Sequence, residues 1–154
     1  MTIRVLFVCL GNICRSPMAE GILRAKAQDA GLELEIDSAA TAGWHVGNPP
    51  DARAVVASRI KGYNIEDQMS RRFRSDDFET FDYIIAMDEA IRRDIEAKRP
   101  AGKSVPIVLM SSFGPDAEDV DVPDPYYTGK FMPVIALLEG YVDGLVAQLL
   151  TDRQ

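Results

Sequence analysis

Residues 3–20 read IRVLFVCLGNICRSPMAE and combine the marks of a buried strand, a loop and the start of a helix. Ile3–Val8 is a nearly continuous apolar run, which is typical of a parallel strand covered on both faces. Pro17 suits the first turn of a helix, where its missing N–H is not needed, and Gly31 ends the helix predicted over 17–29. A strand, a short loop and a helix are therefore predicted in direct succession.

Strand and helix patterns alternate along the rest of the chain. Further strands are predicted at 34–39, 83–87 and 105–110, and further helices at 52–61, 89–98 and 131–149. Because parallel strands are joined by right-handed crossovers, this alternation predicts an α/β fold with helices on both faces of a parallel sheet. No repeat or linker divides the chain, so residues 1–154 are expected to form a single domain. Ligands bind beyond the carboxyl ends of such strands, which favours the loop after the first strand as the site.

The composition excludes several classes of protein. Hydrophobic residues make up 47% and charged residues 27% of the 154 residues, as in ordinary globular proteins. Seventeen Lys and Arg against 24 Asp and Glu give a net charge of −7, which disfavours nucleic-acid or anionic-membrane binding. Two cysteines do not make a secreted disulfide framework, and the first apolar run is too short for a signal sequence or a membrane span. A cytoplasmic protein is expected.

The loop Cys9–Ser16 has the features of an anion site. A glycine-containing loop between a strand and a helix turns backbone N–H groups and the positive end of the helix dipole toward one point. The loop lacks the Gly-Lys-Ser/Thr of a nucleoside-triphosphate loop, and Gly11 lacks the partner glycines of a dinucleotide fingerprint. Instead it opens with a thiol and closes with a guanidinium, in the pattern Cys-x5-Arg-Ser.

These residue types suit the cleavage of a phosphate ester. A thiolate at Cys9 can attack phosphorus and form a cysteinyl phosphate. The planar guanidinium of Arg15 can hold two phosphate oxygens at once. We expect the Ser16 hydroxyl to hydrogen-bond the sulfur, and Asn12 to adopt a left-handed conformation and brace the loop through its amide.

Activation of Cys9 needs more than a helix dipole. A thiol with a pKa of about 8.5 needs a decrease of roughly 3 units, or about 4 kcal/mol, to be fully ionised at neutral pH. A helix N-terminus supplies about 0.3–1 and at best about 2 kcal/mol. Backbone N–H groups, Arg15 and Ser16 are therefore expected to supply the rest.

The segment Val5–Glu20 resembles the signature of the low-molecular-weight protein tyrosine phosphatases. Further blocks match in the same order, including those of the bacterial branch: SAAT at 38–41, GWHVG at 43–47 with Pro50, FDYI at 81–84 with Met87 and Asp88, and DPYY at 124–127. The resemblance implies a three-layer, doubly wound α/β domain with a central four-stranded parallel sheet, and neither a metal nor a cofactor. It also implies phosphotyrosine-containing proteins or peptides as substrates and, in bacteria, a tyrosine kinase as partner.

The resemblance assigns roles residue by residue. It implies that Cys9 is the nucleophile, Arg15 the phosphate clamp and Asp124 the general acid. The phosphate-binding and loop-supporting residues that it implies are Leu10, Gly11, Asn12, Ile13, Cys14, Ser16 and Ser38. Pro123 and Pro125 flank Asp124 and restrict its backbone, so its carboxyl is held at low entropic cost. Aromatic and apolar residues on loops are expected to form the walls of the substrate cleft: Ile13, Trp44, Tyr126 and Tyr127.

Two positions depart from the family pattern. Gln68 stands where many relatives have a His that hydrogen-bonds the loop asparagine, and Ile91 stands where an Asn often follows the Met-Asp pair. Gln68 is still able to donate a hydrogen bond, so the bracing of the loop is left open. Asp88 is interpreted first as the cap of the following helix, with a contact to the phosphate loop as the alternative. His45, the one histidine, is interpreted as structural.

Individual residues disfavour other functions. Protein-arginine phosphatases of this family carry Thr at the position of Ile13, and an isoleucine there favours an aromatic substrate. An arsenate reductase of the same fold needs further cysteines, and none follows Cys14. A non-catalytic phosphate-binding protein is disfavoured because nucleophile, clamp and acid are all present.

Two hypotheses stand for Cys14: it traps oxidised Cys9 in a protective disulfide, or it packs as an inert apolar residue.

Overall fold

A computed structural model describes residues 2–115 and 120–153. Within them lies a four-stranded parallel sheet of order β2–β1–β3–β4, formed by Leu34–Ala40, Ile3–Cys9, Tyr83–Ala86 and Ile107–Leu109. The helices are α1 (Arg15–Asp29), α2 (Ala52–Ile60), α3 (Asp77–Thr80), α4 (Glu89–Glu96), α5 (Pro125–Thr128) and α6 (Phe131–Asp152), with a 3-10 helix, η1, at Met110–Phe113. The α/β class and the four-stranded parallel sheet are confirmed.

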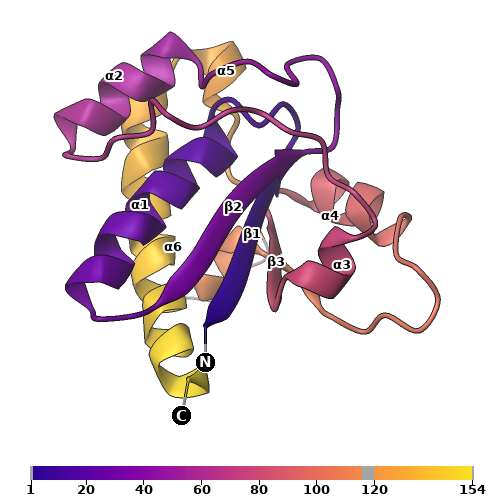
Figure 1. Cartoon of the computed structure of the whole chain (residues 1–154). Coiled ribbons are helices and arrows are strands. Elements are labelled where there is room, and N and C mark those ends of the chain that lie inside the picture. The colour runs from indigo at the N-terminus through magenta and orange to yellow at the C-terminus, as the bar shows by residue number, and fades with distance from the viewer. Residues whose placement is uncertain (1, 116–119, 154) are drawn as a thin grey trace.

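Helices cover both faces of the sheet in three layers (Figure 1). α1, α2 and α6 lie on one face, and α3 and α4 lie on the other. Successive residues of β1 alternate between the two cores: Val5 and Phe7 belong to the cluster of α1 and α6, and Leu6 and Val8 to the opposite cluster. All four side chains are fully buried, which is why this strand is apolar without alternation.

The helix α6 packs along the sheet as a core helix. By length and composition it is apolar enough to cross a membrane. Its most apolar stretch of 18 residues has a mean hydropathy of 1.5, and 33% of that stretch is buried inside the fold. It contacts α1, and Lys26 forms an ion pair with Asp143 at 2.6 Å. Its buried side chains recur every three or four residues: Phe131, Val134, Ile135, Leu138, Val142, Leu145 and Leu149.

The boundaries of several elements differ from the prediction. The strand predicted at 105–110 ends at Leu109, because η1 begins at Met110. The first helix begins at Arg15, two residues before Pro17, so the loop after β1 is tighter than expected. The four-residue helices α3 and α5 have no counterpart in the prediction, since four residues are too few to show a helical period.

Candidate active site

The loop between β1 and α1 lies at the carboxyl end of a central strand, where the fold predicts a ligand. Asn12 has a φ of 58° and is the one non-glycine with positive φ in the described part of the chain, which confirms the left-handed conformation expected for it. The turn that it makes points its N–H at the Cys9 sulfur, 3.3 Å away. Cys14 is the N-cap residue of α1 and its side chain makes no capping bond, so the first N–H groups of the helix can face an anion.

Cys9 sits at the base of this loop with 3% of its surface exposed. Its Sγ shares a hydrogen bond with Ser16 Oγ at 2.9 Å, as predicted. The Ser16 hydroxyl and the Asn12 N–H therefore both face the sulfur.

Asn12 braces the loop from behind through three hydrogen bonds. Its Nδ2 donates to Ser16 Oγ at 2.8 Å and to Ser38 Oγ at 2.9 Å, and its Oδ1 accepts from the Arg71 N–H at 3.1 Å. The Ser38 hydroxyl donates in turn to Glu20 Oε1 at 2.8 Å. Side chains of α1 and β2 and the backbone of residue 71 thus fix the shape of the loop.

Gln68 is not among the hydrogen-bond partners of Asn12 in the described part of the chain. Its Nε2 donates to the Pro17 carbonyl at 3.0 Å, so it supports the start of α1 instead. The Arg71 N–H is the donor to Asn12 Oδ1 in the described structure. Sequence reasoning missed this donor because a backbone N–H leaves no mark in the residue types.

Arg15 is held by acidic and carbonyl groups in a buried position. Its Nη1 donates to Asp88 Oδ2 at 2.8 Å and to the Val122 carbonyl at 2.9 Å, and its Nη2 lies 3.6 Å from Asp124 Oδ2. Burial disfavours the charged guanidinium, but Cys9, Asp88 and Asp124 outweigh burial and raise the pKa of Arg15. The positive charge at the mouth of the loop is therefore permanent.

Asp88 makes both of the contacts that were weighed for it from the sequence. Its Oδ1 accepts from the Ile91 N–H at 2.8 Å and caps α4, which confirms the structural interpretation. Its Oδ2 binds Arg15, so the same carboxylate also orients the cation of the loop. A sequence pattern alone cannot show that one carboxylate serves both partners.

Asp124 approaches the loop from the segment before α5. It is the N-cap residue of α5, and its Oδ1 accepts from the Tyr126 N–H at 3.1 Å. Its backbone is extended, as expected for a residue followed by proline, and Pro125 occupies the first turn of the helix. The Asp124 side chain is three-quarters buried, with Oδ2 turned toward Arg15.

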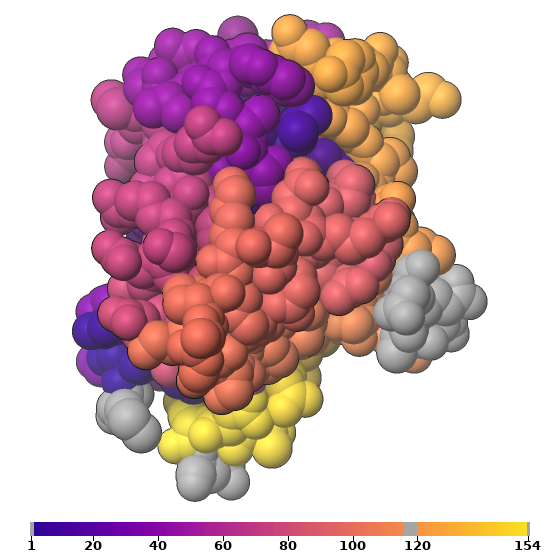
Figure 2. Space-filling view, turned by 90° about the vertical axis from the view of Figure 1, so that its right-hand side faces the viewer, coloured from indigo at the N-terminus to yellow at the C-terminus, as the bar shows by residue number. Residues whose placement is uncertain are grey.

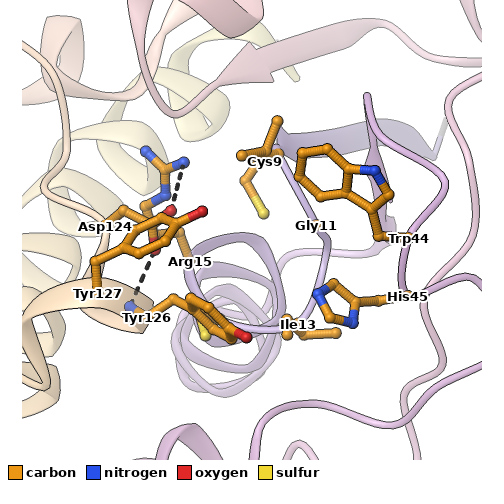
Figure 3. A pocket seen from close by; sticks show the side chains of 11 residues that line it. Cys9, Gly11, Ile13, Arg15, Trp44, His45, Asp124, Tyr126 and Tyr127 are labelled. Atoms are coloured by element: carbon orange, nitrogen blue, oxygen red, sulfur yellow. Dashed lines mark hydrogen bonds and ion pairs between the residues drawn. The ribbon is translucent and has the colours of Figure 1, made fainter.

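A cleft with about 360 Å³ of empty space opens over the loop. In the space-filling view, indigo atoms of the N-terminal segment lie in a hollow between the purple and the orange segments (Figure 2). In the close-up, the Cys9 sulfur points into the space between Trp44, Tyr127 and Arg15 (Figure 3). The cleft is lined by Cys9, Leu10, Gly11, Ile13, Cys14, Arg15, Trp44, His45, Asp124, Tyr126 and Tyr127. Asn12, Ser16 and Ser38 lie outside this lining and support the loop from behind.

The rim of the cleft is aromatic. Trp44 is 71% exposed and Tyr127 is 72% exposed. The Tyr126 ring meets the Tyr127 ring edge-on, with centroids 5.1 Å apart. His45 also lines the cleft, with its ring 6.1 Å from Tyr126 and its Cδ2 3.0 Å from where a Cβ on Gly11 would lie. His45 therefore lies in the wall of the cleft, glycine at position 11 makes room for its ring, and its structural role stays a prediction.

Cys14 is a second buried thiol beside the cleft. Both cysteines are free. Burial, followed by the charges of Asp51, Cys9 and Asp124, raises the pKa of the Cys14 thiol, so this thiol stays protonated at neutral pH. The hypothesis of a protective disulfide stays a prediction.

A thiol, a fixed cation and a carboxyl group thus meet in one cleft. Together they can bind a phosphate group, attack its phosphorus and transfer a proton. Among residues 2–115 and 120–153, no group of three or more His, Cys, Asp or Glu side chains is placed to hold a metal ion. The fold and the site define a class of α/β proteins. In this class, the loop between the first strand and the first helix can bind an anion, and a cysteine lies at the base of that loop.

The chain belongs to the low molecular weight phosphotyrosine protein phosphatase family, whose model matches residues 4–154. It is 40% identical to the low molecular weight protein-tyrosine-phosphatase YfkJ of Bacillus subtilis over 154 residues, 99% of each chain. It is 42% identical to the low molecular weight protein-tyrosine-phosphatase of Streptomyces coelicolor over 157 residues, 96% of this chain and 93% of that protein. These relatives are hydrolases by name, and the family assignment makes this chain an enzyme of the same kind.

Solved structures agree with this assignment. The crystal structure of YfkJ superposes with a TM-score of 0.94 and covers 100% of this chain and 98% of that one. The structure of the YwlE arginine phosphatase, a cysteine-to-serine mutant with a phosphorylated active site serine, has a TM-score of 0.88 at 25% identity. It covers 98% of both chains. The family therefore includes an arginine phosphatase with the same fold.

Proposed function

We propose that this enzyme hydrolyses phosphotyrosine in proteins through a cysteinyl-phosphate intermediate on Cys9. One observation carries the proposal: the Cys9 sulfur sits at the base of the cleft, and the Arg15 guanidinium lies 3.6 Å from the Asp124 carboxylate at its mouth. A nucleophile, a clamp and a proton donor thus face the same space.

In the first step the Cys9 thiolate attacks phosphorus, forming an S–P bond as the P–O bond to the tyrosine breaks. Arg15 and the backbone N–H groups of the loop other than that of Asn12 hold the phosphate oxygens, on which negative charge is spread in the transition state. Asp124 gives its proton to the leaving phenolic oxygen. The tyrosine side chain then leaves neutral.

In the second step water attacks phosphorus and the S–P bond breaks. Asp124, now ionised, accepts a proton from the water, and inorganic phosphate leaves the loop. The Cys9 sulfur departs as a thiolate, stabilised by the hydrogen bond with Ser16 and by the Asn12 N–H. Each group returns to its starting protonation state, so the cycle balances without a further reactant.

Two features support a cysteine nucleophile and an aromatic substrate. In the YwlE structure, the active site residue that carries phosphate is a serine that replaces a cysteine. Ile13, Trp44, Tyr126 and Tyr127 give the cleft of the present enzyme apolar and aromatic walls. A phenyl ring between such walls gains from both burial and ring contacts.

A protein-arginine phosphatase is the second candidate, and the similarity to YwlE is the observation that favours it. The apolar Ile13, where arginine phosphatases are expected to carry a threonine hydroxyl, supports the tyrosine enzyme. We further propose that residues 1–154 act as one domain and that the natural substrate is a protein phosphorylated by a tyrosine kinase.

Turnover of matched phosphotyrosine and phosphoarginine peptides tests the proposal. The wild type should release phosphate from the phosphotyrosine peptide with the higher kcat/KM, and Cys9→Ser should release none from either. Preference for phosphoarginine would replace the tyrosine assignment. Unchanged turnover by Cys9→Ser would remove the cysteinyl phosphate altogether.

A further inference from the structure

The segment that carries Asp124 has little stability of its own. Asp124 is held at the start of α5, a helix of four residues between Pro125 and Thr128. An isolated helix of this length does not form in water, because nucleation costs more than one turn of hydrogen bonds returns. The position of the Asp124 carboxyl therefore depends on what packs against α5.

The side chain of Arg53 reaches from α2 to α5. Its Nη2 donates to the Tyr126 carbonyl at 3.2 Å. Its guanidinium also lies over two aromatic rings, 5.5 Å from the Tyr126 centroid and 4.9 Å from the Phe131 centroid. Arg53 thus contacts the middle of α5 and the first residue of α6, on either side of the turn at Gly129.

Asp51 connects Arg53 to the phosphate loop. Its two carboxylate oxygens accept from Arg53 Nε at 3.1 Å and Nη2 at 2.9 Å, a bidentate pair. The hydrogen bonds from Arg53 lower the pKa of Asp51, so this pair is ionised at neutral pH. The Asp51 N–H donates to the Ile13 carbonyl of the phosphate loop at 2.8 Å.

We propose that Arg53 is a positioning residue that sets the distance between the acid and the nucleophile. The contacts form a continuous connection from Ile13 through Asp51 and Arg53 to Tyr126, whose N–H binds Asp124. The inference rests on the proposed function, since it assigns Asp124 the proton transfer. Arg53 itself does not touch the reacting atoms.

The physical reason is the steep dependence of proton transfer on distance. A general acid must come within about 2.6–3.2 Å of the leaving oxygen, and a misplacement of about 1 Å can cost on the order of 10²-fold in rate. Without Arg53, α5 keeps the cap by Asp124 but loses the hydrogen bond and the ring contact that Arg53 makes with Tyr126. The phosphate loop keeps the bonds of Asn12, Ser16 and Ser38 and is unaffected.

The test compares two leaving groups in four variants. For Arg53→Ala we expect kcat/KM on phenyl phosphate to fall by about tenfold and on p-nitrophenyl phosphate by less than about threefold, since nitrophenol needs little protonation to leave. In an Asp124→Asn background the same substitution should change phenyl phosphate turnover by less than about twofold, because there is no acid left to position. Arg53→Lys should recover part of the loss, since a lysine keeps the charge but cannot bind Asp51 and Tyr126 together.

Arg59→Ala is the matched control on the same helix. Arg59 pairs with Glu66 on the surface, and Arg59→Ala should leave both substrates unchanged. Equal losses on both substrates for Arg53→Ala, or full additivity with Asp124→Asn, would overturn the role of Arg53. The failure of Asp124→Asn itself to discriminate between leaving groups would instead overturn the proposed acid, so the two failures are distinct.

Discussion

Substitution of Asn12 separates the side-chain bracing of the phosphate loop from its backbone strain. Asn12 is 2% exposed, has a φ of 58° and makes three side-chain hydrogen bonds. Asn12→Gly removes the three bonds but suits the positive φ. Asn12→Ala removes the same bonds and also forces an alanine into the left-handed region.

The expected magnitudes follow from these contacts. Three hydrogen bonds at about 1 kcal/mol each make Asn12→Gly about 3 kcal/mol less stable than the wild type. An alanine in the left-handed region costs roughly 1–2 kcal/mol, and the extra freedom of glycine in the unfolded chain offsets roughly 0.5–1 kcal/mol of that difference. Asn12→Ala should therefore be less stable than Asn12→Gly by about 1 kcal/mol.

Urea unfolding of the three proteins measures both differences, provided that the slopes of the transitions agree. Ser70→Ala is the control, because the Ser70 hydroxyl donates to the Gly11 carbonyl of the same loop at 3.0 Å without any positive φ. It should lose about 1 kcal/mol. A glycine variant as stable as the wild type would refute the bracing role, and an alanine variant as stable as the glycine variant would refute the strain.

Asp124→Asn should lower kcat/KM on phosphotyrosine by roughly 10²–10⁴-fold and affect p-nitrophenyl phosphate less; equal losses would remove it from the acid role. Arg15→Lys should stay nearly inactive, because a point charge cannot hold two oxygens, and a rate close to that of the wild type would contradict the bidentate clamp. Trp44→Ala should raise KM for aryl phosphates by about fivefold, equivalent to about 1 kcal/mol of ring contact, with little change in kcat; an unchanged KM would remove it from the cleft wall. Because its raised pKa keeps Cys14 protonated, iodoacetamide at pH 8 should alkylate Cys9 at least about tenfold faster than Cys14, as peptide mass spectrometry would show; since both thiols are equally buried, equal labelling would contradict the protonated state of Cys14.

The parts of the fold and site that could be predicted are those with a local signal. The apolar run of β1 and the helical period of α6 follow from burial, which acts on each residue type directly. The left-handed conformation of Asn12 and the contact between Ser16 and Cys9 could be predicted because the three residues lie within one short loop. In each case residues that lie close together in the sequence supply both the pattern and its cause.

The parts that could not be predicted depend on distant partners. The Arg71 N–H that binds Asn12 is 59 residues away, and Val122, whose carbonyl binds Arg15, is 107 residues away. His45 joins the cleft wall because Gly11 leaves space for its ring, which no pattern around His45 reveals. The four residues of α5 are too few to show a helical period, and its contact with Arg53 joins residues 73 positions apart in the chain.

Trapping of the intermediate tests the nucleophile most directly. Wild-type enzyme turning over a radiolabelled phosphotyrosine peptide is quenched within milliseconds, digested and mapped by mass spectrometry, with Cys9→Ala quenched in parallel. We expect label on the peptide that contains Cys9, approaching one phosphate per active enzyme, and none on that peptide in Cys9→Ala, which has no side-chain nucleophile at this position. Turnover with no label on Cys9, or label on another residue, would contradict the cysteinyl-phosphate mechanism.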